Sequence, residues 1–147
     1  METLTLPAQL ESLDAIAHYV LKVSQDAGVS RHRAYKFRLA VDELVTNIIV
    51  YGCANLAEIS ILEVRSEIDS RSLKIIVSDT GIAFDPTERV FDRSLLSKPI
   101  EERPIGGLGI FLALQNVDEF SYQVTEKKNI STFSLNLQSN DPSKNQD

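Results

Sequence analysis

Three glycines stand within four positions in the stretch PIGGLGIFLALQNV, residues 104–117. They are Gly106, Gly107 and Gly109, and an apolar run with helical spacing follows them at once. Glycines at the start of a helix favour a phosphate site, because the free backbone N–H groups and the helix dipole attract an anion. The same glycines could instead form a loop that needs unusual backbone angles. The cluster lacks the Lys-Ser/Thr of a Walker loop and the preceding strand of a dinucleotide fingerprint, so alone it is a weak signal.

A carboxylate and a carboxamide stand four residues apart in DELVTN, residues 42–47. Apolar side chains recur around them at helical spacing, which predicts a helix with its apolar stripe turned to the core. Glu43 and Asn47 then share one flank of that helix, about 100° around from the centre of the stripe. From there they could point into a cleft, or they could form a solvated polar edge.

A third polar group ends an apolar, strand-like run in IIVSDTGIAFD, residues 75–85. Asp79 follows the run directly, and Thr80 and Gly81 come next. A carboxylate at a strand end, followed by glycine, can accept hydrogen bonds from an amine of a ligand. Asp-Thr-Gly is also common in turns, because the Asp side chain bonds to the backbone two residues on. Taken singly, each of the three stretches has a purely structural explanation.

The composition is that of one globular domain, with 147 residues of which 43% are hydrophobic and 24% charged. The net charge of −6 argues against nucleic acid as the main ligand, because its binders usually present a basic face. The sequence has no apolar run near the roughly 20 residues of a membrane helix, and its N-terminal residues lack a secretory pattern. With Cys53 as the only cysteine, we expect a cytoplasmic protein without an internal disulfide.

The elements that must position these groups are expected in the order β-α-α-β-β-loop-α-β-β. Helical spacing predicts helices over 9–27, 30–52 and after 109, and β-rich segments predict a short strand over 3–8 and hairpins of 58–67 with 71–79 and 119–126 with 130–137. Because the helices are grouped and the strands come as hairpins, the expected fold class is α+β. The economical architecture is a two-layer sandwich, in which three helices cover one face of a mixed, largely antiparallel sheet.

Two segments are expected to lie outside the packed layers. The stretch 80–104 has poor periodicity, and a loop of that length in a compact domain is usually a functional lid or disordered. Residues 139–147 are all polar or proline and are expected to form a disordered tail. This leaves residues 1–138 as a single domain.

In their order and spacing, the three stretches together resemble the GHKL (histidine-kinase-like) ATPase superfamily of gyrase-type topoisomerases, sensor histidine kinases and the large heat-shock chaperone. Its three boxes match, in chain order, at Glu43 and Asn47, at Asp79 and Gly81, and at Gly106, Gly107 and Gly109. The resemblance spans roughly residues 35–137. It implies a histidine-kinase-like ATPase fold with an ATP lid between the second and third boxes. The glycines of the third box would let the backbone of the lid close on the ATP phosphates.

Within the superfamily, the sequence looks most similar to the small stand-alone serine kinases that double as anti-sigma factors. AVDELVTNIIVYG and GGLGIFLALQNVDEFSY are similar to that branch in detail. Members bind ATP with Mg²⁺, phosphorylate a serine or threonine of a small antagonist protein, sequester a sigma factor and usually work as homodimers. The resemblance therefore implies an ATP-dependent serine/threonine protein kinase that regulates transcription. Its partners would be an anti-sigma-factor antagonist and a sigma factor, with no direct contact to nucleic acid or membrane.

The resemblance also implies a role for each residue of the first two boxes. Glu43 would be the general base that takes the proton from an incoming hydroxyl. Asn47 would offer its amide oxygen to Mg²⁺, which prefers oxygen ligands. Asp79 would accept a hydrogen bond from the adenine amino group, and Gly81 would let the base approach the backbone.

The remaining residues of the implied site lie in the lid and near the end of the chain. The β- and γ-phosphates would be positioned by Gly106, Gly107, Leu108 and Gly109. Arg103, in preference to Arg93, would close over the γ-phosphate, unless the charges of the lid are simply solvated. The final box departs from the family, because KKNISTF, residues 127–133, has no glycine before its threonine. Only Thr132 is carried over, as a residue that bonds the adenine end of the nucleotide through water.

Two other functions fit the same residues. The chain could be an ATP-binding regulatory module that sequesters a partner without efficient phosphotransfer. It could also be an ATPase or a histidine-kinase-type catalytic domain, which is disfavoured because no phosphoacceptor domain precedes it in the sequence. Glu43 favours a catalytic function over nucleotide binding alone.

Asn129 begins an Asn-Ile-Ser glycosylation sequon, which has a meaning only in a secreted protein.

Overall fold

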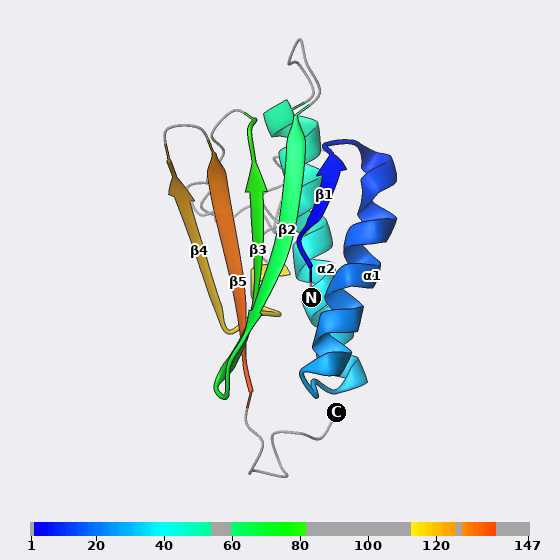
Figure 1. Ribbon diagram of the computed structural model, residues 1–147, viewed down its shortest axis with the longest axis vertical. Coiled ribbons are helices and arrows are strands. Elements are labelled where there is room, and N and C mark those ends of the chain that lie inside the picture. Colours follow the sequence, from blue (N-terminus) through cyan, green and yellow to red (C-terminus); the bar gives the residue numbers. More distant parts are fainter. Residues whose placement is uncertain (1, 54–59, 82–112, 126–127, 138–147) are drawn as a thin grey trace, which may run out of the picture.

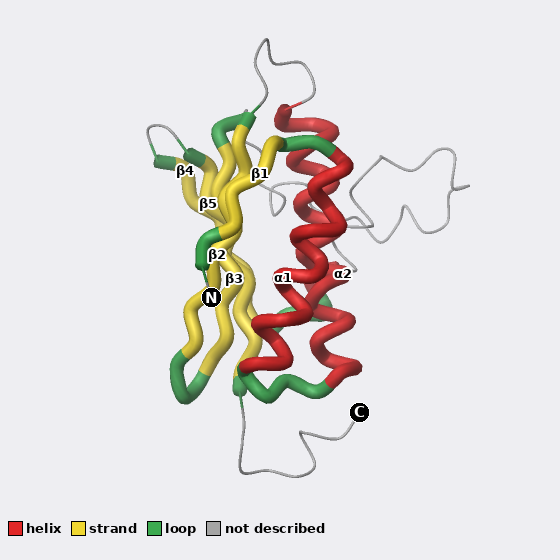
Figure 2. Tube along the Cα trace, turned by 45° about the vertical axis from the view of Figure 1, so that its right-hand side comes forward, coloured by secondary structure: helices red, strands yellow, loops and turns green. Residues whose placement is uncertain are grey.

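The structure is a computed structural model that describes residues 2–53, 60–81, 113–125 and 128–137. Within these ranges, helices form one layer and a twisted sheet forms the other (Figures 1 and 2). The elements are β1 (Leu4–Pro7), a 3-10 turn η1 (Leu10–Ser12), α1 (Leu13–Asp26), α2 (Arg31–Asn47), a π-helix η2 (Ile48–Cys53), β2 (Ile61–Ile68), β3 (Ser72–Asp79), β4 (Glu119–Val124) and β5 (Asn129–Asn136). The expected α+β class and two-layer architecture are confirmed.

Among the described residues, the sheet has five strands in the order β1-β2-β3-β5-β4. All four pairings among the described strands are antiparallel, so the mixed component that the sequence allowed is not found there. The two hairpins, β2-β3 and β4-β5, form as expected. The second hairpin returns with β5 rather than β4 beside β3, and this places Asn129 directly opposite Asp79. That register brings two segments 50 residues apart in the sequence to the same end of the sheet.

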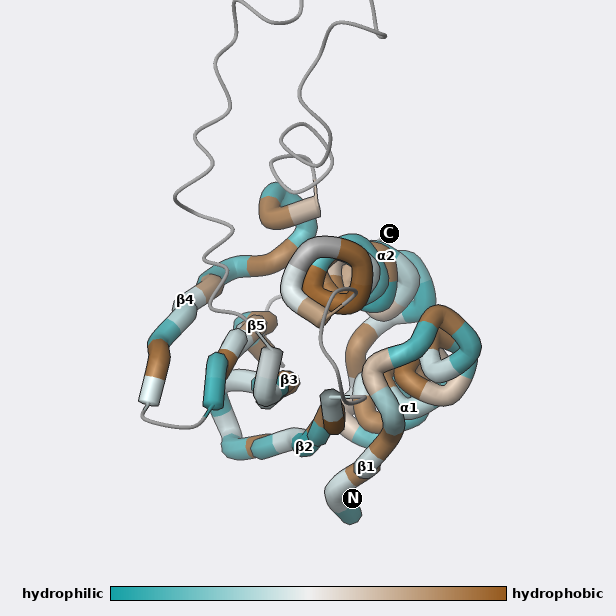
Figure 3. Tube along the Cα trace, turned by 90° about the horizontal axis from the view of Figure 1, so that it is seen from above, coloured by the Kyte–Doolittle hydropathy of each residue, from teal (hydrophilic) through white to brown (hydrophobic). Residues whose placement is uncertain are grey.

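The two helices form where the apolar spacing predicts them, and both turn that stripe to the sheet (Figure 3). Between them, Gly28 has a φ of 78°, which is the left-handed region that favours glycine after a helix. Ser30 caps α2, because its Oγ accepts the Arg33 backbone N–H at 3.3 Å. No helix in the described part of the chain is both long and apolar enough to cross a membrane.

The core lies between the two layers. The largest side chains with no exposed surface come from α1, α2 and three strands of the sheet: Ile16, Phe37, Leu62, Leu73, Ile75 and Phe133. On β3 the core-facing residues alternate with outward-facing ones until the strand ends at Asp79, which is itself buried. The apolar core therefore extends up to the carboxylate of Asp79, one of the candidate site residues predicted from the sequence.

Several predicted features lie outside the described residues. They are the lid over 80–104 beyond Gly81, most of the third helix after Gly109, and the tail over 139–147. Only the last part of that third helix is described, where Ala113 and Leu114 are helical and pack at the edge of the core. The turns of the expected third helix that precede Ala113 stay a prediction.

A substitution at Gly28 tests whether the chain reversal between α1 and α2 depends on backbone conformation alone. A Cβ added at Gly28 would meet no heavy atom within 4 Å. Gly28→Ala should therefore lower the free energy of unfolding by about 1–2 kcal/mol, which is the penalty of left-handed backbone for an L residue. Urea denaturation measures the change.

Gly28→Asn is the matched control for this prediction. Asparagine tolerates the left-handed region better than alanine, so its loss of stability should be the smaller of the two. Equal losses would mean that the side chain, and not the backbone angle, sets the cost at this position.

Candidate functional site

The ends of several elements meet at one end of the molecule. α2 and η2 finish there, β3 ends there at Asp79, and β5 begins opposite Asp79 (Figure 1). Two of the three sequence boxes lie on these ends. The tertiary fold thus brings together residues that the sequence separates by more than 30 positions.

Glu43 and Asn47 contact each other on α2. The Asn47 amide nitrogen Nδ2 donates to the Glu43 backbone oxygen at 2.7 Å and to Glu43 Oε1 at 3.3 Å. Asn47 is 4% exposed, while Glu43 is half-buried. In the described part of the chain, all hydrogen bonds of the Asn47 side chain run through Nδ2. The Asn47 carbonyl oxygen Oδ1 is therefore the part of the amide left for a ligand.

The helix changes its winding directly after Asn47. Residues Ile48–Cys53 form a π-helix, a rare conformation that occurs mostly as short bulges and frequently at functional sites. It ends with Gly52 and Cys53 packed against Gly81, which follows β3. The π-helix thus joins the Glu43–Asn47 end of α2 to the turn that follows Asp79.

The carboxylate of Asp79 is buried and held by two donors. Asp79 is 3% exposed, and its Oδ1 accepts the Gly81 backbone N–H at 2.9 Å and the Asn129 amide Nδ2 at 2.9 Å. The bond to Gly81 is the local turn that Asp-Thr-Gly predicts. Burial raises the pKa of the Asp79 carboxyl above its usual range, and the bonds from Asn129 and Gly81 partly offset that rise.

Only glycine fits at position 81. A Cβ there would lie 2.7 Å from the Gly52 backbone oxygen and 2.8 Å from Cys53 Sγ. Such distances are shorter than real Cβ contacts, and one neighbour is rigid backbone. The glycine of the second box therefore has a packing reason, because η2 approaches the turn too closely for a side chain.

Asn129 is a site residue that sequence reasoning missed. It is 4% exposed, and besides Asp79 it donates to the Gly81 carbonyl oxygen at 2.9 Å. The sequence drew attention to it only as part of a sequon. Nothing in its local sequence shows that it faces Asp79, because that depends on the register between β3 and β5.

Thr132 is not brought to the Asp79 side of the sheet. It lies opposite Ile76, whereas Ser131 lies opposite Val77 on the face that Asp79 shares. Successive side chains on a strand point to opposite faces, so a shift of one residue moves the hydroxyl across the sheet. The Ser131 hydroxyl is buried and has no hydrogen-bond partner among the described residues. In this register Ser131, and not Thr132, is the hydroxyl residue of the final box that lies on the Asp79 face, and the adenine contact expected of Thr132 stays a prediction.

The other expected site residues lie outside the described residues. They are Arg93, Arg103, Gly106, Gly107, Leu108 and Gly109, all within 82–112. Their assignments to the phosphates stay predictions.

The described groups form a set of complementary chemistry. The buried Asp79 carboxylate can accept a hydrogen bond from an amine, the Asn47 amide oxygen suits a hard cation, and the half-buried Glu43 carboxylate can take a proton.

Residues 6–135, which include all of these groups, match the sequence model of the histidine kinase-like ATPase domain. The chain belongs to the histidine kinase-like ATPase family. The superfamily resemblance is thereby confirmed.

Relatives of this histidine kinase-like ATPase domain include named protein kinases and anti-sigma factors. It is 31% identical over 116 residues to the serine-protein kinase RsbW of Staphylococcus epidermidis, in an alignment that covers 78% of this chain and 73% of that protein. It is 32% identical over 90 residues to the anti-sigma F factor of Clostridium novyi (strain NT), covering 61% of each.

A solved structure shares the fold of this histidine kinase-like ATPase domain. It is the blue-light activated histidine kinase of Erythrobacter litoralis EL346, with a TM-score of 0.52 and 17% sequence identity. The similarity covers 88% of this chain and 42% of that one, so the chain spans less than half of that protein. At this identity the likeness extends to the fold and no further.

The buried Asp79 should make the nucleotide-free wild type less stable at neutral pH than the Asp79→Asn variant. A raised pKa means that the folded protein holds the proton more tightly than the unfolded chain does. Stability is therefore lost as pH rises from the usual carboxyl range through the raised pKa. Asp79→Asn should raise the free energy of unfolding at pH 7, and the gain should vanish in strong acid. Urea denaturation at a series of pH values measures this.

Asp69→Asn is the control, because its change in the free energy of unfolding at pH 7 should have the opposite sign. Backbone N–H groups of Arg71 and Ser72 lower the pKa of the Asp69 carboxyl. A lowered pKa stabilises the fold above the usual carboxyl range, so this variant should lose stability at pH 7. An Asp79→Asn variant less stable than wild type at pH 7 would show that its hydrogen bonds outweigh its burial.

Proposed function

We propose that this protein is an ATP-dependent serine/threonine protein kinase that acts as an anti-sigma factor and phosphorylates a small antagonist protein. The observation that carries the proposal is the Glu43–Asn47 contact, in a chain 31% identical to a serine-protein kinase over 78% of its length. A general base is needed for phosphate transfer and not for nucleotide binding, so the carboxylate beside the amide favours catalysis. The relative named anti-sigma F factor suggests a sigma factor as one class of partner.

The adenine end of the nucleotide would lie against β3 and β5. Asp79 is a buried acceptor with Oδ1 already bonded, so its other oxygen can receive the adenine amino group. The Ser131 hydroxyl, buried without a partner among the described residues, lies on the same face of the sheet. An unsatisfied buried hydroxyl is costly in an empty protein, and a ligand or a bridging water would satisfy it.

The residues present fit Mg²⁺ at the phosphate end. Asn47 would hold the ion through Oδ1, because its Nδ2 is committed to Glu43. The bound ion would supply positive charge that offsets the negative charge of the phosphates. The bond from Nδ2 also fixes which atom of the amide faces outward.

Glu43 would act on the incoming hydroxyl. Its Oε1 accepts from Asn47, which leaves Oε2 to take the proton of a serine or threonine from the antagonist. The Asn47 side chain would thus position both groups, because its Nδ2 contacts Glu43 and its Oδ1 would hold Mg²⁺. The transfer itself then depends mainly on alignment and charge neutralisation.

The assembly belongs to the same proposal. The protein would work as a homodimer, bind the antagonist near the lid over 80–104, and bind a sigma factor on a separate surface. A pull-down from the source cell with and without ATP, followed by mass spectrometry for phosphoserine and phosphothreonine, identifies the partners. Bound partners without phosphate transfer would favour a regulatory module that only sequesters.

Glu43→Gln separates catalysis from binding. The replacement amide keeps an oxygen that can accept from Asn47 Nδ2, but it cannot take a proton. ATP binding should stay within about twofold, and phosphate transfer to the antagonist should fall roughly 10²–10⁴-fold, the usual effect of a general base. Calorimetry and transfer of radiolabelled phosphate measure the two quantities.

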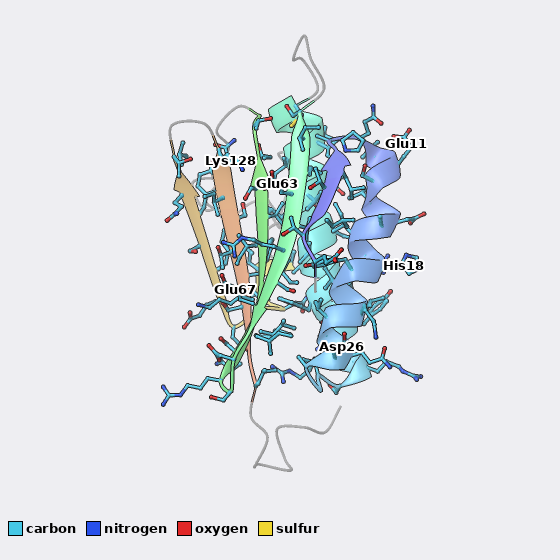
Figure 4. The ribbon with its side chains drawn as sticks, viewed as in Figure 1. Glu11, His18, Asp26, Glu63, Glu67 and Lys128 are labelled. Carbon is cyan, nitrogen blue, oxygen red and sulfur yellow. The ribbon has the colours of Figure 1, made fainter. Side chains whose placement is uncertain are left out.

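Glu67→Gln is the matched control. Glu67 is exposed near the β2-β3 hairpin, where it pairs with Arg65, and Figure 4 shows it well away from the end at which α2 and β3 finish. Its transfer rate should equal that of wild type. Transfer by Glu43→Gln at the wild-type rate would remove Glu43 from the chemistry.

Asn47 should govern the effect of Mg²⁺ on ATP binding. Mg²⁺ should strengthen ATP binding by the wild type, and Asn47→Leu should abolish that gain because it removes the oxygen ligand. Asn47→Asp retains an oxygen and should keep part of the gain, despite the added charge beside Glu43. Calorimetry with and without Mg²⁺ measures the difference for each variant. A full gain in Asn47→Leu would show that other residues hold the ion.

A further inference from the structure

The side chain of Asn129 joins three groups at the end of the sheet. Its Nδ2 donates to Asp79 Oδ1 and to the Gly81 carbonyl oxygen, each at 2.9 Å. Its Oδ1 accepts the Tyr122 hydroxyl at 3.2 Å, across the β4-β5 hairpin. An amide has two N–H donors, so both are used on one side and the oxygen on the other. These bonds fix the orientation of the amide plane.

The same bonds determine which carboxylate oxygen of Asp79 is available to accept a hydrogen bond from a ligand. Within the described residues, every hydrogen bond of the Asp79 carboxylate ends on Oδ1. The carboxylate can rotate about its last bond, and the pair of donors at Oδ1 opposes that rotation. Asp79 Oδ2 is then left in a constant direction. Asn129 also ties the Gly81 carbonyl to the same point, so the turn and the carboxylate move as one unit.

We propose that Asn129 is a positioning residue for nucleotide recognition: its amide holds Asp79 Oδ1 and the Gly81 carbonyl together, and so presents Asp79 Oδ2 to the adenine amino group. The proposal rests on the nucleotide site proposed above. It also gives a role to the place where the chain departs from the family pattern, since Asn129 lies within KKNISTF, the segment that lacks the expected glycine.

The amide also affects the charge state of Asp79. A buried carboxylate that lost this donor would hold its proton more tightly, because burial already raises its pKa and the Asn129 bond is the larger of the two effects that lower it. A protonated carboxyl is a weaker acceptor for an amine. Asn129 therefore serves adenine recognition both by direction and by favouring the ionised form of Asp79.

Other titratable groups lie near Asp79. Burial raises the pKa of the Cys53 thiol, the negative charge of Asp79 adds to that rise, and a bond from Ser60 opposes it, so the thiol is neutral at neutral pH. Lys128 and Glu63 line a shallow depression beside Asp79 and pair with each other at 3.4 Å (Figure 4). With the thiol neutral and these two charges paired, Asn129 is, among the described residues, the neighbour that lowers the pKa of Asp79 most.

Asn129→Leu tests the proposal, because leucine has a similar size and no donor. Its affinity for ATP with Mg²⁺ should fall about 10- to 100-fold at pH 7.5, the usual effect of losing a hydrogen bond to a charged group. The ratio of variant to wild-type affinity should worsen at pH 6 and improve at pH 8.5, because Asp79 ionises less readily in the variant. Calorimetry across this range measures the ratio, which cancels the titration of ATP itself.

A second measurement needs no nucleotide. Carboxyl carbon chemical shifts of Asp79 in the free protein should titrate at higher pH in Asn129→Leu than in wild type. Should the leucine variant fail to fold, Asn129→Asp retains the shape of the side chain. It should raise the titration of the carboxyl pair, because two carboxylates in contact share a proton. Tyr122→Phe should give a smaller change in the same direction.

The outcomes distinguish the two proposals. An unchanged Asp79 titration, or an affinity loss equal at all pH values, would reduce Asn129 to a packing residue and overturn its positioning role. Failure of wild type to bind ATP would overturn the proposed function, while the Asp79 titration would still decide whether Asn129 controls the carboxylate. Asp79→Asn provides the reference, because position 79 then carries no ionisable group and its affinity cannot vary with the titration of Asp79.

Discussion

The buried carboxylate of Asp79 is the constraint around which this end of the molecule is built. Desolvation makes an ionised group unfavourable at 3% exposure unless donors replace the lost water. One donor is local, the Gly81 N–H, and the other comes from β5 through Asn129. The second donor requires β5 beside β3 in one register, so sheet topology and the charge at the site depend on each other.

The glycine that follows Asp79 links the sheet to the helical layer. Because position 81 has no side chain, the end of the π-helix η2 can pack against the turn. The π-helix continues α2 directly after Asn47, so the packing also determines where the Glu43–Asn47 pair lies relative to Asp79. The close approach of two backbones is thus what connects the carboxylate proposed for adenine binding to the residues proposed for phosphate chemistry.

Local sequence rules accounted for much of the fold. The apolar stripes of α1 and α2, the stop at Gly28 and the cap at Ser30 are effects within a few residues, and all four are found. The hairpins follow from adjacent strand segments for the same reason. The choice of β5 rather than β4 as the neighbour of β3 is not a local effect, because it depends on how a long connection returns to the sheet.

The sequence by itself determined the residue types of the site and their spacing: Glu43 and Asn47 one helical turn apart, and Asp79 followed by Gly81. These are properties of a single helix and a single turn, which short-range geometry controls. Only the tertiary structure decided that Asn129 completes the Asp79 site and that Ser131, not Thr132, shares its face. The reason is physical: the side chains of a strand alternate between two faces, so the register of β5 against β3 decides which of its residues reach the site.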